Sequence, residues 1–316
     1  MTTDARLCLR IRAIREEAQG IHSFELAAAD GAPLPPFTAG AHVTLHLPVG
    51  LARSYSLVNP CRDGAPYVIA VNRDAASRGG SRYLHERARV GDVLEADGPR
   101  NLFALQEDAP ASVFIAGGIG ITPVRAMVRR LDELGRPWQL HYCARSREAA
   151  AFLAEFEGDA RVQLYFDHGP GQRRLDIGAV LAGLPADAHV YCCGPAAMLE
   201  DYLAHAASLP PDRVHYERFA AEQAQATGGG YRVQLARSGR SVTVQPGQTI
   251  LQALLDAGLQ PPHSCMQGVC GSCETPVLAG RPDHRDQVLT EREKAQGRTM
   301  MICCSGSLDE ELVLDI

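Results

Sequence analysis

The sequence predicts a multidomain chain: an antiparallel β-barrel at residues 1–104, a doubly wound α/β domain at 105–222, a linker at 223–230 and a smaller domain at 231–316. Three observations predict this order. Alternating apolar residues punctuated by Gly and Pro come first, apolar runs alternating with helical patterns follow, and a run of cysteines comes last. The length of 316 residues suits two or three domains.

Composition excludes several classes of partner. The net charge of −6 argues against nucleic acid, and no apolar run approaches the roughly 18 residues that a membrane span needs. The polar N-terminus lacks the apolar region of a signal peptide. We therefore expect a cytoplasmic protein, a monomer, whose ten cysteines are reduced thiols and metal ligands, because disulfides are rare in that compartment.

The first domain shows the period of two that is typical of strands. Apolar residues alternate in 7–11, 43–47 and 67–71, and Gly or Pro residues separate these segments. Several short strands with long turns and little helix favour a closed antiparallel barrel.

A candidate flavin site follows the strand at 43–47. A flavin needs a flat surface, donors at its ring edge and a charge that balances its phosphate. Tyr55 can supply the surface, Ser54 and Ser56 the donors, and Arg53 the charge. The alternative interpretation is an ordinary half-exposed strand.

A second segment of the first domain predicts where the phosphate binds. Arg78, Gly79, Gly80 and Ser81 come directly before the helical segment 82–86. A glycine-rich turn at a helix N-terminus binds anions, because its backbone N–H groups are free. A single site of this kind suits one phosphate, so we expect FMN rather than FAD.

The second domain alternates between two patterns. Apolar strand-like runs are separated by amphipathic helical stretches, which predicts a parallel sheet with helices on both faces. The strand-like runs are 113–116, 140–143, 162–166 and 189–193, and the clearest helices are 123–134 and 196–206.

A glycine-rich turn after the first of these strands predicts a pyridine-nucleotide site. Gly117, Gly118 and Gly120 allow close approach of a pyrophosphate, and Thr122 and Pro123 open the next helix. The pattern is not the Rossmann fingerprint, because Pro123 occupies the place of the third glycine.

The end of the strand at 189–193 offers a partner for that turn. Ligands of open α/β sheets bind outside the carboxyl ends of the strands, so Cys193, followed by Gly194, is placed to face a nicotinamide. The alternative is a buried structural cysteine. Phe219 places an aromatic ring just after the domain's last strand.

The cysteine run predicts an iron–sulfur cluster. Cys265, Cys270 and Cys273 have the spacing C-x4-C-x2-C, and Cys303 lies 30 positions further on. Plant-type 2Fe–2S ferredoxins use this spacing, whereas structural zinc sites usually use paired short knuckles. Zinc therefore remains the alternative.

Two details of the cluster motif can be read from neighbouring residues. Gly268 and Gly271 permit the backbone conformations that a tight loop with three ligands requires. Spacing favours Cys303 over Cys304 as the fourth ligand, with Cys304 a small packing residue.

These motifs, in this order, resemble the reductases of two-component Rieske oxygenases, the group of phthalate dioxygenase reductase and vanillate O-demethylase reductase. The resemblance spans essentially the whole chain. It implies an FMN-binding barrel, an NADH-binding domain and a C-terminal β-grasp ferredoxin domain. It also implies roles for individual residues: Arg53, Ser54, Tyr55, Ser56, Gly80 and Ser81 hold FMN, Gly118, Thr122 and Cys193 line the NADH site, and Phe219 covers the flavin ring.

Within that family, the segment 283–286 recurs, and we interpret it as a turn that helps to fix the cluster loop. We assign no mechanistic role to His284.

The expected function is electron transfer from NADH through FMN and the 2Fe–2S cluster to a separate Rieske non-haem iron oxygenase with an aromatic substrate. This chemistry needs no catalytic side chain, and none is assigned. Arg145 and Arg147 favour NADPH, whereas Asp167 and the resemblance favour NADH, which we predict. The alternatives are a stand-alone NADH:acceptor reductase and a non-enzymatic metal-cluster binding module.

Overall fold

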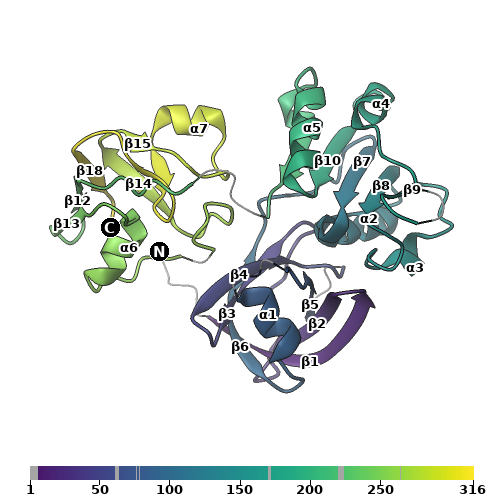
Figure 1. The fold of residues 1–316 in the computed structure, drawn as a ribbon, viewed down its shortest axis with the longest axis horizontal. Helices are drawn as coiled ribbons and strands as arrows, with labels where there is room; N and C mark the ends of the chain where they lie inside the picture. Colours follow the sequence, from purple (N-terminus) through teal and green to yellow (C-terminus); the bar gives the residue numbers. More distant parts are fainter. Residues whose placement is uncertain are drawn as a thin grey trace. The chain divides into compact units, whose positions relative to one another are not determined.

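A computed structural model describes residues 6–60, 64–75, 77, 79–169, 172–219, 224–263 and 265–316. Arg78 and the first residue of the expected linker, 223, lie outside the described residues. The chain divides into two compact units, Met1–Glu217 and Arg218–Ile316 (Figure 1). Among the described residues, no helix has both the length and the apolar character needed to cross a membrane.

The first unit begins with an antiparallel sheet of six strands in the order β4-β3-β6-β1-β2-β5. An isolated bridge between Leu57 and Ile69 joins the two ends of this order, so the sheet closes into the predicted barrel. The helix α1, Gly80–Glu86, contacts β4 and β5. The strands are β1 Leu7–Ala18, β2 Ile21–Ala28, β3 His42–Leu47, β4 Leu51–Ser56, β5 Tyr67–Asn72 and β6 Val93–Arg100.

Alternation of side chains explains why these segments form a barrel. In β3, Val43, Leu45 and Leu47 are buried in an apolar cluster together with residues from every other strand of the sheet. Because successive side chains of a strand point to opposite faces, one apolar face is enough to fill the interior of a small barrel.

The remainder of the first unit is a parallel sheet in the order β11-β10-β7-β8-β9. The order reverses between β7 and β10, which makes their carboxyl ends the switch point where ligands of such sheets bind. The strands are β7 Ser112–Gly117, β8 Trp138–Ala144, β9 Val162–Phe166, β10 His189–Cys193 and β11 Val214–Glu217. The helices are η1 Gly118–Gly120, α2 Ile121–Leu134, α3 Leu153–Phe156, α4 Ile177–Ala182, α5 Ala196–Ala206 and η2 Pro211–Arg213.

Helices cover both faces of this sheet, which confirms the doubly wound arrangement (Figure 1). On one face α2 contributes Val124, Met127 and Leu131 to an apolar cluster, and on the other α4 and α5 contribute a second cluster that includes Leu181 and Tyr202. α2 begins two residues before the predicted start, and Pro123 lies in its first turn, where a missing N–H breaks no helical hydrogen bond.

The barrel and the parallel sheet share a continuous core. Val58 and Phe103, from the barrel part of the chain, belong to the same buried cluster as Met127 of α2. The guanidinium of Arg125 also donates a hydrogen bond of 2.7 Å to the carbonyl of Val58. This packing explains why the two predicted domains form one compact unit.

The second unit contains a sheet in the order β13-β12-β18-β14-β16 and a two-stranded sheet of β15 and β17. The helix α6 packs Ile250, Leu251 and Leu254 into the core, as expected for a β-grasp domain. The elements are β12 Tyr231–Leu235, β13 Ser241–Val244, α6 Ile250–Asp256, β14 Glu274–Ala279, β15 Pro282–Asp283, α7 Glu291–Gln296, β16 Thr299–Met301, β17 Gly306–Ser307 and β18 Glu311–Leu314.

The described part of the expected flexible linker is bonded to the second unit. The N–H of Ala226 donates to the carbonyl of Cys304 at 2.7 Å, and the N–H of Gly247 donates to the carbonyl of Thr227 at 2.8 Å. The Gln225 amide donates to the carbonyl oxygens of Met266 and Cys303. These residues therefore brace the segments that carry the cysteines, and the role of 223–230 as a flexible linker stays a prediction.

Candidate cofactor sites

The four cysteines of the cluster motif lie together in the second unit. Cys265, Cys270 and Cys273 belong to the loop before β14, and Cys303 follows β16; all four are buried. The thiol of Cys265 contacts those of Cys270 and Cys303, and Cys303 also contacts Cys273. Contact with Cys265 and burial raise the pKa of the Cys270 thiol. Cysteine binds iron as a thiolate, and the sulfur atoms of these four residues already lie together. The four residues therefore fit a 2Fe–2S cluster.

The loop has the backbone shape that the sequence predicted. Gly268 and Gly271 both have positive φ, 71° and 70°. A Cβ on Gly268 would lie only 2.4 Å from Cys304 Sγ, so this position admits no larger residue without a shift. The N–H of Gln267 donates to Cys265 Sγ at 3.3 Å, which illustrates the predicted aim of backbone donors at sulfur.

Cys304 has different surroundings from Cys303. Its thiol donates to the carbonyl of Met301 at 3.7 Å and lies 3.8 Å from Ser305 Oγ. Cys303 contacts both Cys265 and Cys273, whereas the thiol of Cys304 contacts Cys303 and Ser305. This arrangement favours Cys303 as the fourth ligand.

No group of three or more His, Cys, Asp or Glu in the described part of the chain is arranged around a point as the ligands of one metal ion would be. A 2Fe–2S cluster does not require such an arrangement, because its four thiolates are divided between two irons.

The strand β4 carries the residues expected to hold the flavin. The side chain of Arg53 lies against the start of α1, and a Cβ on Gly80 would come within 2.8 Å of Arg53 Cγ. Ser54 Oγ lies 2.9 Å from Thr44 Oγ1, and Tyr55 packs its half-buried ring against the barrel core. Gly80 thus provides the close approach between the glycine turn and Arg53.

Ser77, which the sequence did not single out, organises this turn. Its Oγ accepts hydrogen bonds from the N–H groups of Gly79 and Arg82 at 3.1 and 3.3 Å, and from Ser81 Oγ at 2.9 Å. Gly79 itself has a φ of 109°, which explains the glycine.

Ser56, at the end of β4, meets the end of β11. Its hydroxyl forms a hydrogen bond with the carboxyl group of Glu217, and Glu217 Oε2 is buried with no further partner among the described residues. Some atoms of Glu217 are exposed, but the oxygen Oε2 of its carboxyl group is buried. Burial raises the pKa of Glu217 to about 8, against the opposing effect of the Ser56 hydrogen bond.

His42 is a second polar residue beside Ser56, its partner across the ladder of β3 and β4. Burial, followed by the charge of Arg100, lowers the pKa of His42 to about 4, and its Nε2 has no hydrogen-bond partner within the described residues. Unpaired buried atoms on Glu217 and His42 are the kind of feature that the polar edge of a bound flavin would satisfy. Glu217 belongs to the motif Glu217-x-Phe219, one of the motifs that carry the family resemblance, but the sequence assigned no role to its side chain or to His42.

At the switch point of the parallel sheet, two glycine turns pack directly on each other. A Cβ on Gly120 would lie 2.0 Å from the carbonyl oxygen of Cys193, and one on Gly117 would lie 2.6 Å from Cδ of Pro195. Gly194 is similarly confined, since its Cβ would lie 2.6 Å from Met198 Sδ. These glycines therefore serve close packing between the ends of β7 and β10.

The other predicted nucleotide residues differ in exposure. Gly118 has a φ of 55° and no atoms near its missing side chain, so its backbone is open to a ligand. Thr122 is buried and donates to the carbonyl of Ile119 at 2.8 Å. Cys193 has no exposed surface and burial raises its thiol pKa, which agrees with the structural alternative and leaves its contact with nicotinamide a prediction.

Phe219 lies at the start of the second unit and is 43% exposed. Its expected position over the flavin ring therefore remains a prediction. The residues considered for nucleotide choice follow β8 and β9: Arg145 is exposed, and Arg147 pairs with Glu157 and stacks on Phe166. The N–H of Asp167 donates to the carbonyl of Ala144, which brings the ends of these two strands together.

Comparison with known proteins finds relatives that agree with the iron–sulfur motif. The family described as the 2Fe-2S iron-sulfur cluster binding domain matches residues 233–306. Phenoxybenzoate dioxygenase subunit beta of Ectopseudomonas oleovorans is 55% identical over 99% of this chain and 98% of that protein. Tetrachlorobenzoquinone reductase of Sphingobium chlorophenolicum is 49% identical over 98% of this chain and 97% of that protein.

Among solved structures, this chain is similar to phthalate dioxygenase reductase, which is described as a modular structure for electron transfer from pyridine nucleotides to [2Fe-2S]. The TM-score is 0.75 and the identity 40%, over 99% of this chain and 98% of that one. The same enzyme from Burkholderia cepacia aligns with all of this chain. The three predicted folds are confirmed in their predicted order.

Proposed function

Because this chain belongs to the family of phthalate dioxygenase reductase and related oxygenase reductases, we propose that it is the NADH-dependent reductase component of a two-component oxygenase. The observation that carries the proposal is the set of four buried thiols in mutual contact, in a chain that also has a flavin barrel and a nucleotide domain. A chain equipped in this way accepts electrons from a nucleotide and delivers them elsewhere.

Each cofactor has a proposed set of residues. Cys265, Cys270, Cys273 and Cys303 hold the 2Fe–2S cluster. The barrel holds FMN through Arg53, Ser54, Tyr55, Ser56, Gly79, Gly80 and Ser81. The parallel sheet holds NADH through Gly117, Gly118, Gly120, Thr122, Cys193 and Gly194, and Phe219 covers the flavin ring.

The flavin and the cluster, when bound, supply the conversion of a two-electron donor into single electrons. The chain's own residues bind and orient. Arg53 balances the phosphate charge, and the carboxyl group of Glu217 holds the Ser56 hydroxyl in place. The packed turns of Gly120 and Cys193 keep the nucleotide edge of the sheet rigid, because neither can move without displacing the other.

The acceptor that we propose is a separate Rieske-type oxygenase acting on an aromatic compound, since one relative is a subunit of phenoxybenzoate dioxygenase. We also propose a cytoplasmic monomer, in keeping with ten cysteines that include four cluster ligands. A second candidate is a stand-alone NADH:acceptor reductase, which the likeness to tetrachlorobenzoquinone reductase favours.

The test compares the full chain with a chain that ends at Phe219, since the first unit ends at Glu217. Both are given NADH and either ferricyanide or the cognate oxygenase, with full-length Cys270→Ser as the control for loss of the cluster alone. We expect both shortened and Cys270→Ser proteins to reduce ferricyanide but to drive no oxygenase turnover.

Undiminished oxygenase turnover by the shortened chain would remove the cluster from the route. Direct quinone reduction by the full chain, without support of any oxygenase, would favour the second candidate. Absence of NADH oxidation by the full chain would leave only a binding module.

A further inference from the structure

The segment 283–289 of the second unit connects the two parts of the chain that carry the cluster thiols. The N–H of Gln287 donates to the carbonyl of Gly268, within the loop of the first three cysteines, at 2.9 Å. The N–H of Arg285 donates to Ser305 Oγ at 3.1 Å, two residues after Cys303. One short segment therefore braces both sides of the site.

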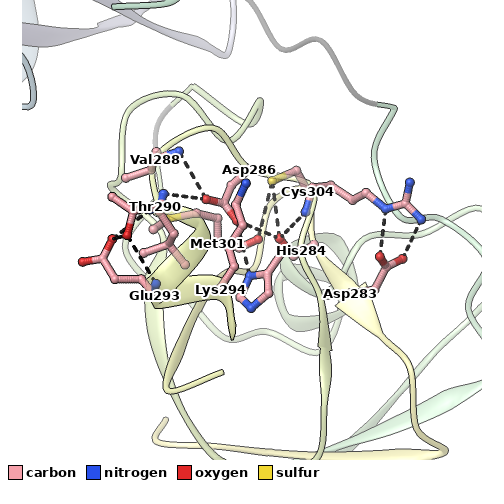
Figure 2. Close-up of polar contacts among 12 residues, drawn as sticks. Asp283, His284, Asp286, Val288, Thr290, Glu293, Lys294, Met301 and Cys304 are labelled. Carbon is pink, nitrogen blue, oxygen red and sulfur yellow. Dashed lines mark hydrogen bonds and ion pairs between the residues drawn. The ribbon is translucent and has the colours of Figure 1, made fainter. Parts of the chain in front are cut away.

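The carboxylate of Asp286 lies at the centre of this segment and is 1% exposed (Figure 2). Its Oδ2 accepts hydrogen bonds from the N–H groups of Leu289 and Val288, at 2.8 and 3.2 Å. Its Oδ1 accepts one from Ser305 Oγ at 3.5 Å. A buried carboxylate is tolerated only when donors surround it in this way.

His284 is a further neighbour of that carboxylate. Its Nδ1 lies 3.5 Å from Asp286 Oδ1, close enough for attraction, yet neither ring nitrogen makes an aligned hydrogen bond within the described residues. Burial tends to raise the pKa of Asp286, but the His284 ring, the Leu289 N–H and the charge of Lys294 together hold it below its usual range. Asp286 is therefore an ionised, buried charge at neutral pH.

This charge lies close to the backbone that carries the cluster ligands, beside Gly268 on one side and Ser305 on the other. A Cβ on Gly268 would lie 2.4 Å from Cys304 Sγ and 3.1 Å from the Cα of Asp286, so the three residues are in van der Waals contact around that glycine. Cys304 directly follows the ligand Cys303, and its thiol is within electrostatic range of Asp286. Charges in such a buried environment interact more strongly than charges in water.

We propose that Asp286 is a positioning residue for the cluster, which holds the turn of Cys303 and Ser305 against the loop of the other three ligands and lowers the cluster's reduction potential by its buried negative charge. The inference rests on the proposed function, because it requires the 2Fe–2S cluster. The physical reason is that a nearby anion opposes the addition of an electron, and cluster potentials depend on surrounding charge and hydrogen bonds.

The experiment is a potentiometric titration of the full-length holoprotein, followed by the electron paramagnetic resonance of the reduced cluster. Asp286→Asn keeps the shape and removes the charge, so we expect a higher midpoint potential than in the wild type. Asp286→Glu keeps the charge and should retain a potential close to the wild-type value. Asp283→Asn is the matched control, because Asp283 lies in the same segment but is partly exposed and pairs with Arg285, so its loss should shift the potential less.

An unchanged potential in cluster-loaded Asp286→Asn overturns the proposal, and so does an equal rise in Asp286→Glu. If Asp286→Asn does not retain its cluster, Lys294→Gln decides. It leaves Asp286 in place with less compensating charge, so the potential must fall, and an unchanged value overturns the proposal. A wild-type protein without the 2Fe–2S resonance would instead contradict the proposed function, so the two failures are distinguishable.

Discussion

Replacement of Glu217 by glutamine tests the junction between the barrel and the parallel sheet. The folded chain raises the pKa of this carboxyl from its ordinary value of 4.5 to about 8, chiefly because the group is buried. Between these values the unfolded chain is ionised while the folded chain keeps the proton. Unfolded chains therefore bind fewer protons, and the stability of the first unit falls as pH rises from about 4.5 to 8.

The size of the effect on stability follows from the difference between the pKa of Glu217 in the folded chain and in the unfolded chain. Integrated between pH 5 and pH 8, a shift of this kind weakens the fold by about 3 to 4 kcal/mol, with no reduction for solvent screening because the carboxyl is enclosed. The amide of the Glu217→Gln variant would be neutral at every pH and would still reach Ser56. We therefore expect Glu217→Gln to become more stable than the wild type by about this amount on going from pH 5 to pH 8, or roughly 10 °C in Tm.

The chain contains a convenient probe for this measurement. Trp138 is the only tryptophan, and it is buried in β8 of the first unit, so its fluorescence follows unfolding of that unit alone. Urea titrations at several pH values give the unfolding free energy by linear extrapolation. Glu95→Gln, which removes an exposed carboxylate paired with Arg6, is the control and should show no comparable change with pH. If the difference in unfolding free energy between wild type and Glu217→Gln stays constant from pH 5 to pH 8, the pKa of Glu217 is not raised by folding.

Three further predictions concern the cofactors. Cys303→Ser should lose the iron–sulfur absorbance and Cys304→Ser should keep it, because Cys303 contacts both Cys265 and Cys273; the reverse result would move the ligand by one position. Acid release of the flavin followed by mass measurement should give FMN, since one glycine turn serves one phosphate, and recovery of mainly FAD would contradict this. The ratio kcat/KM should favour NADH over NADPH; a clear preference for NADPH would assign the exposed Arg145 to a 2′-phosphate.

The sequence predicted the fold class because each layer has its own period. Residue types alternate in β3 because the core of the barrel lies on one face of the strand. β7 and β10 are continuous apolar runs because helices bury both faces of the parallel sheet. The cluster motif was equally predictable, because three ligands within nine residues must lie close together in the folded chain.

Contacts between distant segments were not predictable in the same way. Nothing in the residues around Ser56 or Glu217 indicates that the ends of β4 and β11 meet, since that depends on how two sheets pack. The linker at 223–230 contains contacts that were unpredictable for another reason. Its small and polar residues suggest flexibility, but the bonds of Ala226 and Thr227 to the second unit use backbone atoms, which composition does not reveal.

The segment around Asp286 combines both difficulties. The sequence predicts a turn at residues 283–286, but the residue type Asp does not reveal how deeply its carboxylate is buried. Only the structure separates Asp286, enclosed by donors from Leu289 and Ser305, from Asp283, which pairs with Arg285.

The central claim is that electrons from NADH reach a 2Fe–2S cluster held by Cys265, Cys270, Cys273 and Cys303 of this same chain. Anaerobic mixing of the full chain with NADH, followed by freezing and electron paramagnetic resonance, tests it directly. We expect the resonance of a reduced 2Fe–2S cluster to appear while the flavin absorbance bleaches, and we expect Cys270→Ser to show the bleaching without the resonance. Bleaching of the flavin in the wild type with an intact cluster that stays oxidised would contradict it.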